Sequence, residues 1–210
     1  MSYYLKLDLP KNPLRYTAEQ ESQRQITGGY NLVRPEEILS DELMDCFSAM
    51  KVTPRFVTLF GRNDQTSALE DRLIHTDLSM NPDGSWRKCL FGINWELEGS
   101  HNVFSWYNMD RVKAIWPTEE LSKNSKYKLL NGIHYVTRGN MGIPDDAVKL
   151  DETVIDGPTL VRTDVPHLTL YESTTYKRLG ISVRFDETAF KDWTDVVAVF
   201  SPFEKKNDLQ

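Results

Sequence analysis

The stretch Arg178-Leu179-Gly180-Ile181-Ser182-Val183-Arg184-Phe185 decides the fold class, because its apolar and polar residues alternate without a break. An alternation with a period of two places the two sets on opposite faces of a β-strand. The face with leucine, isoleucine, valine and phenylalanine is typical of a hydrophobic core. The other face carries Arg178, Gly180, Ser182 and Arg184. Two guanidinium groups beside a hydroxyl indicate that this second face lines a polar pocket.

A second stretch with strand character lies upstream, from Gly157 to Leu170. It begins with a Gly-Pro turn signal and continues with β-branched and apolar residues, which favour strands. In such a strand His167 would point inward, together with Val165 and Thr169. His167 is therefore a candidate metal ligand.

Two more candidate ligands lie in the segment from Leu73 to Leu78. His75 and Asp77 are two residues apart, so both side chains leave the same face if the segment is a strand. Two imidazoles and one carboxylate can hold one face of an Fe(II) ion and leave the other face open for oxygen and a further ligand. An inward aspartate is costly without a nearby cation, so we interpret Asp77 as a metal ligand with His75 and His167. A salt bridge to a nearby arginine is the alternative.

Together these residues resemble the 2-oxoglutarate- and Fe(II)-dependent dioxygenases, in particular short prokaryotic and phage members, over residues 55 to 186. The resemblance lies in the His-x-Asp of His75 and Asp77, in the Val-Pro-His that ends at His167, and in an arginine eleven residues further on. It implies that the two histidines and the aspartate bind Fe(II). It also implies that Arg178 binds the distal carboxylate of 2-oxoglutarate, which is a planar partner for a guanidinium.

Two other residues are expected beside the cosubstrate. Ser182 shares a strand face with Arg178, and Asn94 lines the same pocket if the apolar set of Leu90 to Leu97 faces the core. We therefore predict that Arg178, Ser182 and Asn94 bind 2-oxoglutarate. Arg184 lies on the same face and competes with Arg178 for the carboxylate; its alternative role is a surface ion pair.

The resemblance implies hydroxylation of a C–H bond, with 2-oxoglutarate converted to succinate and CO2. The family's halogenases have a small residue in place of the metal carboxylate, so Asp77 argues for hydroxylation or a related oxidation. A cupin-like metalloenzyme, such as an isomerase, is the alternative, and it would use the same ligands without needing Arg178. A jelly-roll protein that only binds a ligand would need no metal. The substrate is expected to be a small molecule or a side chain, and no motif identifies it.

The fold is expected to be mainly β, with N-terminal helices, in a single domain over residues 1–210. Short strands separated by turns favour a double-stranded β-helix, the jelly roll of cupins, over a parallel α/β sheet. Trp95, Trp106 and Tyr107 are expected in the core or in the wall of a substrate pocket. Further elements are expected as a strand over Tyr4 to Leu9, helices over Ala18 to Gln25 and Glu36 to Met50 with a cap signal at Ser40, and a polar insertion over Trp116 to Met141 that covers the site.

Composition limits the partners. A net charge of -6 does not favour nucleic acid. The sequence has no apolar run long enough to span a bilayer and no signal sequence, so we expect a cytoplasmic protein without a membrane partner. Cys46 and Cys89 are expected as reduced structural thiols. His101 and His134 have no histidine or carboxylate at a useful spacing and are expected to be structural. The oligomeric state is left open.

Overall fold

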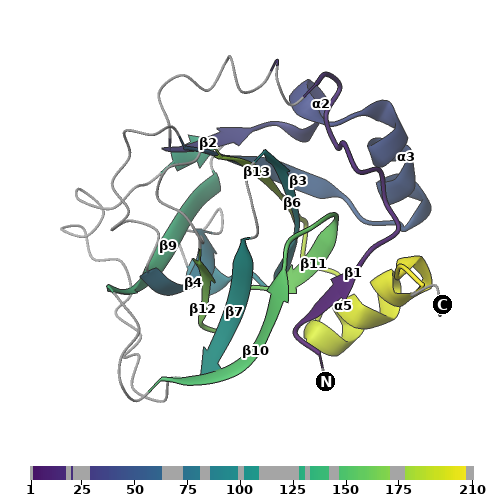
Figure 1. Cartoon of the computed structure of the whole chain (residues 1–210). Helices are drawn as coiled ribbons and strands as arrows, with labels where there is room; N and C mark the ends of the chain where they lie inside the picture. Colours follow the sequence, from purple (N-terminus) through teal and green to yellow (C-terminus); the bar gives the residue numbers. More distant parts are fainter. Residues whose placement is uncertain are drawn as a thin grey trace.

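Two antiparallel β-sheets and three short α-helices make up the part of the chain that the structure describes (Figure 1). In this computed structural model, the described residues are 2–17, 20, 29–62, 73–80, 86–98, 102–108, 128–130, 133–141, 147–170 and 178–206. The expectation of a mainly β fold is confirmed.

The first sheet has six strands and contains the stretch whose alternation decides the fold class. In spatial order its strands are β1 (Tyr4–Lys6), β11 (Thr159–Arg162), β6 (Phe91–Glu98), β13 (Arg178–Phe185), β3 (Pro54–Arg62) and β2 (Gly29–Val33). The four apolar residues of β13 are buried, as predicted, and Ile181, Val183 and Phe185 belong to the main core. On the opposite face Ser182 and Arg184 are buried as well.

The second sheet has seven strands and contains the predicted metal ligands. In spatial order its strands are β10 (Val148–Val154), β7 (Val103–Asn108), β12 (His167–Leu170), β4 (Leu73–Met80), β9 (Ile133–Met141) and β8 (Lys128–Leu130), and β5 (Trp86–Lys88) pairs with β4 off this path.

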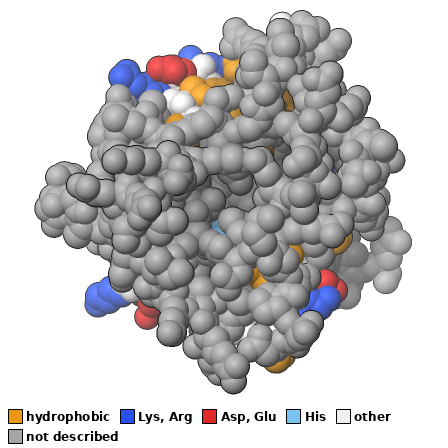
Figure 2. All heavy atoms as spheres, turned by 90° about the vertical axis from the view of Figure 1, so that its left-hand side faces the viewer, with side chains coloured by type: hydrophobic (Ala, Val, Ile, Leu, Met, Phe, Trp, Pro, Cys, Tyr) orange, Lys and Arg blue, Asp and Glu red, His pale blue; other side chains and the backbone are white. Residues whose placement is uncertain are grey.

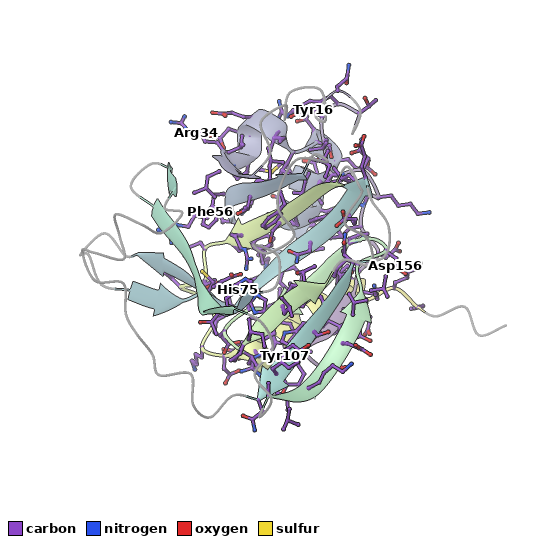
Figure 3. The ribbon with its side chains drawn as sticks, turned by 60° about the vertical axis from the view of Figure 1, so that its left-hand side comes forward. Tyr16, Arg34, Phe56, His75, Tyr107 and Asp156 are labelled. Carbon is purple, nitrogen blue, oxygen red and sulfur yellow. The ribbon has the colours of Figure 1, made fainter. Side chains whose placement is uncertain are left out.

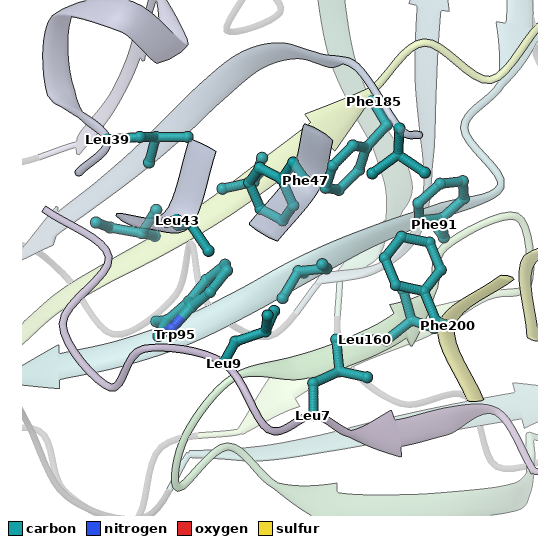
Figure 4. Packing of buried hydrophobic residues seen from close by; sticks show 14 of the residues in the cluster. Leu7, Leu9, Leu39, Leu43, Phe47, Phe91, Trp95, Leu160, Phe185 and Phe200 are labelled. Carbon is teal, nitrogen blue, oxygen red and sulfur yellow. The ribbon is translucent and has the colours of Figure 1, made fainter. Parts of the chain in front are cut away.

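The main hydrophobic core lies between the six-stranded sheet and the helices. The helices α2 (Pro35–Ile38), α3 (Asp41–Ala49) and α5 (Trp193–Phe200) lie on the side of this sheet that is turned away from the second sheet (Figure 1). Figure 4 shows side chains from helices and strands packed together, among them Leu39, Leu43, Phe47, Phe91, Trp95, Leu160, Phe185 and Phe200. The other face of the six-stranded sheet is turned toward the second sheet. It is not part of the main hydrophobic core and can therefore carry polar side chains.

The helical predictions are confirmed at one place and incomplete at another. Residues 36–50 hold two helices, α2 and α3, and Ser40 caps the second by accepting a hydrogen bond from the Leu43 amide at 3.2 Å. Of the helix expected over residues 18–25, only Gln20 lies within the described residues. Within the described ranges no helix is both long enough and apolar enough to cross a membrane.

The expectation of N-terminal helices is confirmed by α2 and α3 but is incomplete, because α5 lies near the C-terminus. Asp192 caps this helix, and its side chain accepts hydrogen bonds from two amides of the first turn. Trp193, Val196 and Phe200 form its buried face. The short 3-10 turn η1 (Ser201–Phe203) follows, and an isolated bridge then joins Leu7 to Glu204.

Three strand predictions need correction. The stretch from Gly157 to Leu170 forms two strands in different sheets, β11 and β12, because the chain crosses from one sheet to the other between them. The strand expected over residues 4–9 ends at Lys6. The stretch over residues 116–141, expected as an insertion, contributes β8 and β9 to the seven-stranded sheet, and its remainder lies outside the described residues.

Candidate metal centre

His75, Asp77 and His167 lie together on the face of the seven-stranded sheet that is turned toward the six-stranded sheet. His75 and Asp77 leave the same face of β4, and β12 pairs with β4 where His167 lies opposite His75. One ligand atom from each residue fits into a group whose members are all within 4.8 Å of one another. Figure 3 shows His75 in the middle of the molecule. We call these three residues the metal centre.

The distances within the metal centre fit a divalent ion after a small contraction. Asp77 Oδ1 lies 3.5 Å from His75 Nε2 and 3.9 Å from His167 Nε2. An octahedral ion with ligand bonds of about 2.1 Å holds neighbouring ligand atoms about 3 Å apart. Shifts of less than about 1 Å would therefore complete the coordination, which is within the range of side-chain motion.

His167 is held in the form that binds metal. Its Nδ1 lies 2.8 Å from the carbonyl oxygen of Val165, which only accepts hydrogen bonds, so Nδ1 carries the proton and Nε2 keeps its lone pair. The ring also stacks on Phe104, with centroids 4.8 Å apart. Burial, and then the neighbouring His75, lower the pKa of His167 to about 3. The imidazole is therefore neutral at physiological pH, as a metal ligand must be.

The metal centre is approached from the side of His75. The side chain of His75 is 17% exposed, whereas those of Asp77 and His167 are 1% and 3% exposed. Figure 2 shows a small area of histidine surface in one face of the molecule. By its exposure, His75 is the member of the metal centre that a ligand from solvent would meet first.

Asp77 divides its two oxygens between the histidines and a buried arginine. Oδ1 faces the two imidazoles, while Oδ2 accepts a hydrogen bond from Nη2 of Arg184. Arg184 is 4% exposed and Asp77 1% exposed, so the pair is shielded from water. The proposed alternative of a surface ion pair for Arg184 is therefore wrong. Asp77 forms the salt bridge that the sequence offered as the alternative to metal binding, and Oδ1 still faces the two histidines, where it could bind a metal ion.

Backbone hydrogen bonds fix Asp77 where the chain passes between the two sheets. Its amide donates to the carbonyl oxygen of Thr163 at 3.1 Å, and its carbonyl oxygen accepts from the amide of Cys89 at 2.9 Å. The hydroxyl of Thr163 also donates to the carbonyl oxygen of Cys89 at 2.9 Å. Thr163 lies between β11 and β12, and Cys89 between β5 and β6. Both crossings thus contact the residue that links the histidines to Arg184.

The predicted cosubstrate residues are only partly described. Arg178 pairs with Arg62 through the backbone of β13, and its side chain lies outside the described residues. Ser182 is opposite Asn94 on β6 and opposite Thr58 on β3. We call Thr58, Ser182 and Asn94 the polar row.

The polar row has buried oxygens that no described group satisfies. Thr58 and Ser182 are fully buried, and neither their hydroxyls nor Oδ1 of Asn94 have a hydrogen-bond partner among the described residues. Leaving such a group unsatisfied costs about 1–3 kcal/mol, which favours a polar ligand or water at this place. Thr58 was not predicted as a site residue. The signal was a polar residue at an inward position of a strand that is otherwise apolar.

A small cavity between the sheets adjoins the polar row and the phenylalanine that stacks on His167. Its lining residues include Phe60, Asn94, Glu96, Phe104, Thr169 and Gly180. Asn94 belongs to the polar row, while Phe104 stacks on His167. The prediction that Asn94 lines a pocket is confirmed, although none of the residues that line this cavity belongs to the metal centre.

The remaining residues of interest are structural or undescribed. Trp95, Trp106 and Tyr107 are buried, and the two indole N–H groups donate to the carbonyl oxygens of Pro10 and Arg162 at 3.0 and 2.8 Å. These three aromatic residues lie in the hydrophobic core, which was one of the two positions expected for them. Neither cysteine is part of a disulfide; Cys89 is buried and Cys46 is partly buried. His101 lies outside the described residues, and His134 is described only as a backbone position of β9.

No protein-family model matches the chain, and a search of curated proteins finds no match. The geometry and chemistry of the metal centre therefore carry the functional argument.

Proposed function

We propose that this protein is an Fe(II)- and 2-oxoglutarate-dependent oxygenase that hydroxylates a C–H bond. The substrate, O2 and 2-oxoglutarate would give hydroxylated substrate, succinate and CO2. The observation that carries the proposal is the inward group of His75, Asp77 and His167, since two histidines and one carboxylate with open positions are typical of non-haem Fe(II) oxygenases. Bound there, iron would supply the activation of oxygen.

The protein's own residues would hold and orient the reactants. Nε2 of His75, Oδ1 of Asp77 and Nε2 of His167 are the three donors. The hydrogen bond from His167 to the carbonyl of Val165 keeps that ring in one tautomer and one orientation. All three donors belong to neighbouring strands of one sheet, so the opposite side, toward the six-stranded sheet, is left for the cosubstrate.

The local charges favour a dianionic ligand beside a divalent ion. Arg184 balances Asp77, and the two histidines are neutral as ligands, so these four residues add no net charge. A divalent ion then leaves a charge of two to be balanced in a buried place, where uncompensated charge is costly. The carboxylate that 2-oxoglutarate places at the ion would supply part of that balance, while its distal carboxylate would pair with Arg178.

The polar row supports the same ligand. Its two unsatisfied hydroxyls offer hydrogen-bond donors to a carboxylate within the space between the sheets. The unsatisfied atom of Asn94 is the acceptor Oδ1, so Asn94 would contact a carboxylate through the N–H groups of the same amide. We propose that Ser182 and Asn94 contact 2-oxoglutarate, as the sequence predicts, and that Thr58 joins them. Arg178 is proposed to pair with the distal carboxylate by a bidentate, charge-assisted bond.

We also propose that the two sheets form a double-stranded β-helix. What supports this is the order in which the chain visits them: β3, β6, β11 and β13 belong to one sheet, and β4, β7 and β12, which alternate with them along the chain, belong to the other. A single domain over residues 1–210 and a cytoplasmic location remain proposals, the latter in keeping with two free thiols. A small molecule or side chain is the proposed substrate; nucleic acid is not favoured.

The test is release of succinate from 2-oxoglutarate by protein reconstituted with Fe(II) and ascorbate, screened over pools of candidate substrates. Parent protein should bind about one Fe(II) and turn over 2-oxoglutarate slowly even without substrate. His75→Ala and Asp77→Ala should abolish both. Asp156→Ala is the matched control, because this carboxylate is exposed and pairs with Lys6. Metal binding without 2-oxoglutarate binding would favour a cupin-like metalloenzyme, and no metal binding would favour a ligand-binding protein.

Arg178→Ala separates cosubstrate binding from metal binding. It should weaken 2-oxoglutarate binding by roughly 2–5 kcal/mol, as for a truncated buried charge pair, and leave Fe(II) binding nearly intact. Arg34→Ala is the matched control, since Arg34 is half exposed and its ion pair with Glu37 contributes little. Equal 2-oxoglutarate affinity in both variants would contradict the role of Arg178.

A further inference from the structure

We propose that Arg184 is a positioning residue that makes Asp77 bind the metal ion through a single oxygen, Oδ1. This inference rests on the metal centre of the proposed function and adds a residue that acts on the ion only through another side chain. The features that carry it are the division of the two carboxylate oxygens of Asp77 and the close fit of the guanidinium that holds one of them.

The two oxygens of Asp77 have different partners. Oδ2 accepts from Nη2 of Arg184, whereas Oδ1 points toward Nε2 of both histidines. A carboxylate can bind a metal through one oxygen or through both. To bind through both, Asp77 would have to turn Oδ2 away from a cationic donor inside a region shielded from water, where such a bond is strong.

The guanidinium is itself held in place on three sides. Its Nη1 donates to Oγ1 of Thr163 at 3.1 Å and to the carbonyl oxygen of Phe91 at 3.3 Å. It lies against the backbone of Gly92, where an added Cβ would be only 2.9 Å from both Cζ and Nη1. A glycine at this position of β6 therefore makes room for the guanidinium. Because Arg184 is fixed in this way, it can fix Oδ2 in turn.

The consequence for the ion is one additional open position. An octahedral ion bound by His75, His167 and one oxygen of Asp77 has three positions left, while two oxygens of Asp77 would leave two. A keto acid that chelates through its carboxylate and keto oxygens takes two. Only the arrangement that Arg184 enforces then leaves a position for O2.

Metal affinity alone would not separate this role from a simple electrostatic one. Loss of Arg184 removes a positive charge that repels the ion, which favours binding, and frees Oδ2 as a further ligand. The number of positions left to water differs between the two modes, so it is the quantity to measure. A residue that only stabilised the fold would not change it.

The experiment counts water molecules bound to Mn(II) in the keto-acid-free protein by water-proton relaxation. Parent protein should hold three. Arg184→Met should hold two, with a fall of about one third in the bound-water contribution. Arg184→Lys, which keeps a cationic donor for Oδ2, should stay near three. Gly92→Ala keeps Arg184 but displaces its guanidinium, and should also fall toward two. Arg34→Met is the surface control and should match the parent.

The outcomes separate this inference from the proposed function. Three waters in the parent and also in Arg184→Met and Gly92→Ala would overturn the positioning role and leave the metal centre standing. Two bound waters in the parent protein would also overturn the positioning role of Arg184. A parent that binds no Mn(II) and no Fe(II) would overturn both proposals. If Arg184→Met fails to fold, Gly92→Ala decides, because it keeps both charged side chains in the protein and only moves the guanidinium away from Oδ2.

Discussion

The buried pair of Asp77 and Arg184 gives a quantitative prediction for the metal-free protein. We consider Asp77→Leu, Arg184→Met and the double variant, all treated with chelator so that bound metal does not contribute to stability. Each single change leaves one charge without its partner at a place that is 1% or 4% exposed. Breaking a buried pair in this way typically costs about 3–5 kcal/mol. That is a large share of the stability of a typical domain.

The double variant should cost much less than the two single changes together. It removes both charges and replaces them with apolar groups of similar size, which is often close to neutral. What remains is the loss of the hydrogen bonds from Arg184 to Thr163 and to the carbonyl of Phe91, at about 1 kcal/mol each. We expect a cost of about 2 kcal/mol for the double variant, and hence a departure from additivity of at least about 4 kcal/mol.

Urea denaturation followed by circular dichroism measures the free energies of unfolding. Ser2→Ala, at an exposed position, serves as the reference for ordinary experimental scatter. Additivity of the two single costs to within about 0.5 kcal/mol would refute the reasoning, because independent sites behave in that way. It would mean that the two side chains do not depend on each other in the metal-free state.

Three further predictions concern other parts of the molecule. The metal-free protein should lose stability as the pH falls from 6.5 toward 3, because His167 takes up a proton near pH 6.5 in the unfolded chain, whereas its pKa in the folded protein is about 3. The loss of unfolding free energy is on the order of 4 kcal/mol. Measured against pH, the unfolding free energy should fall less steeply in His167→Asn than in the parent. Ser40→Ala should lower the free energy of unfolding by about 1 kcal/mol by removing the cap of α3, whereas Ser40→Thr should nearly preserve it in the same urea assay. Phe47→Ala should cost about 3–5 kcal/mol because the side chain is fully buried, and a cost below about 1 kcal/mol by thermal or urea melts would contradict its place in the core.

The sequence predicted the features that depend on short-range patterns, such as strand alternation, residue spacing and helix capping. The alternation in β13 and β6 and the two-residue spacing of His75 and Asp77 depend only on strand geometry, and each predicted which side chains share a face. The cap at Ser40 likewise located the break between α2 and α3.

The parts that were missed depend on contacts between distant segments or on conflicting local signals. Arg184 and Asp77 are 107 residues apart, and only the stacking of the two sheets shows that they meet. Thr58 is recognisable as a site residue only once Ser182 is known to lie beside it. In α5 the cap at Asp192 and the apolar spacing indicate a helix, but three of its eight residues are valines, which favour strands.

The position of the main core has a consequence for how this protein can change over time. Because the helices and the outer face of the six-stranded sheet supply most of the apolar packing, the residues that sustain folding are largely separate from those that face the metal centre. Substitutions in the inter-sheet space would then alter ligand preference with little effect on the packed layer behind it. The exceptions are Asp77 and Arg184, because their buried ion pair would affect both the stability of the fold and the metal centre. Selection or laboratory evolution toward new substrates would be expected to vary the cavity lining while these two residues are retained as a unit.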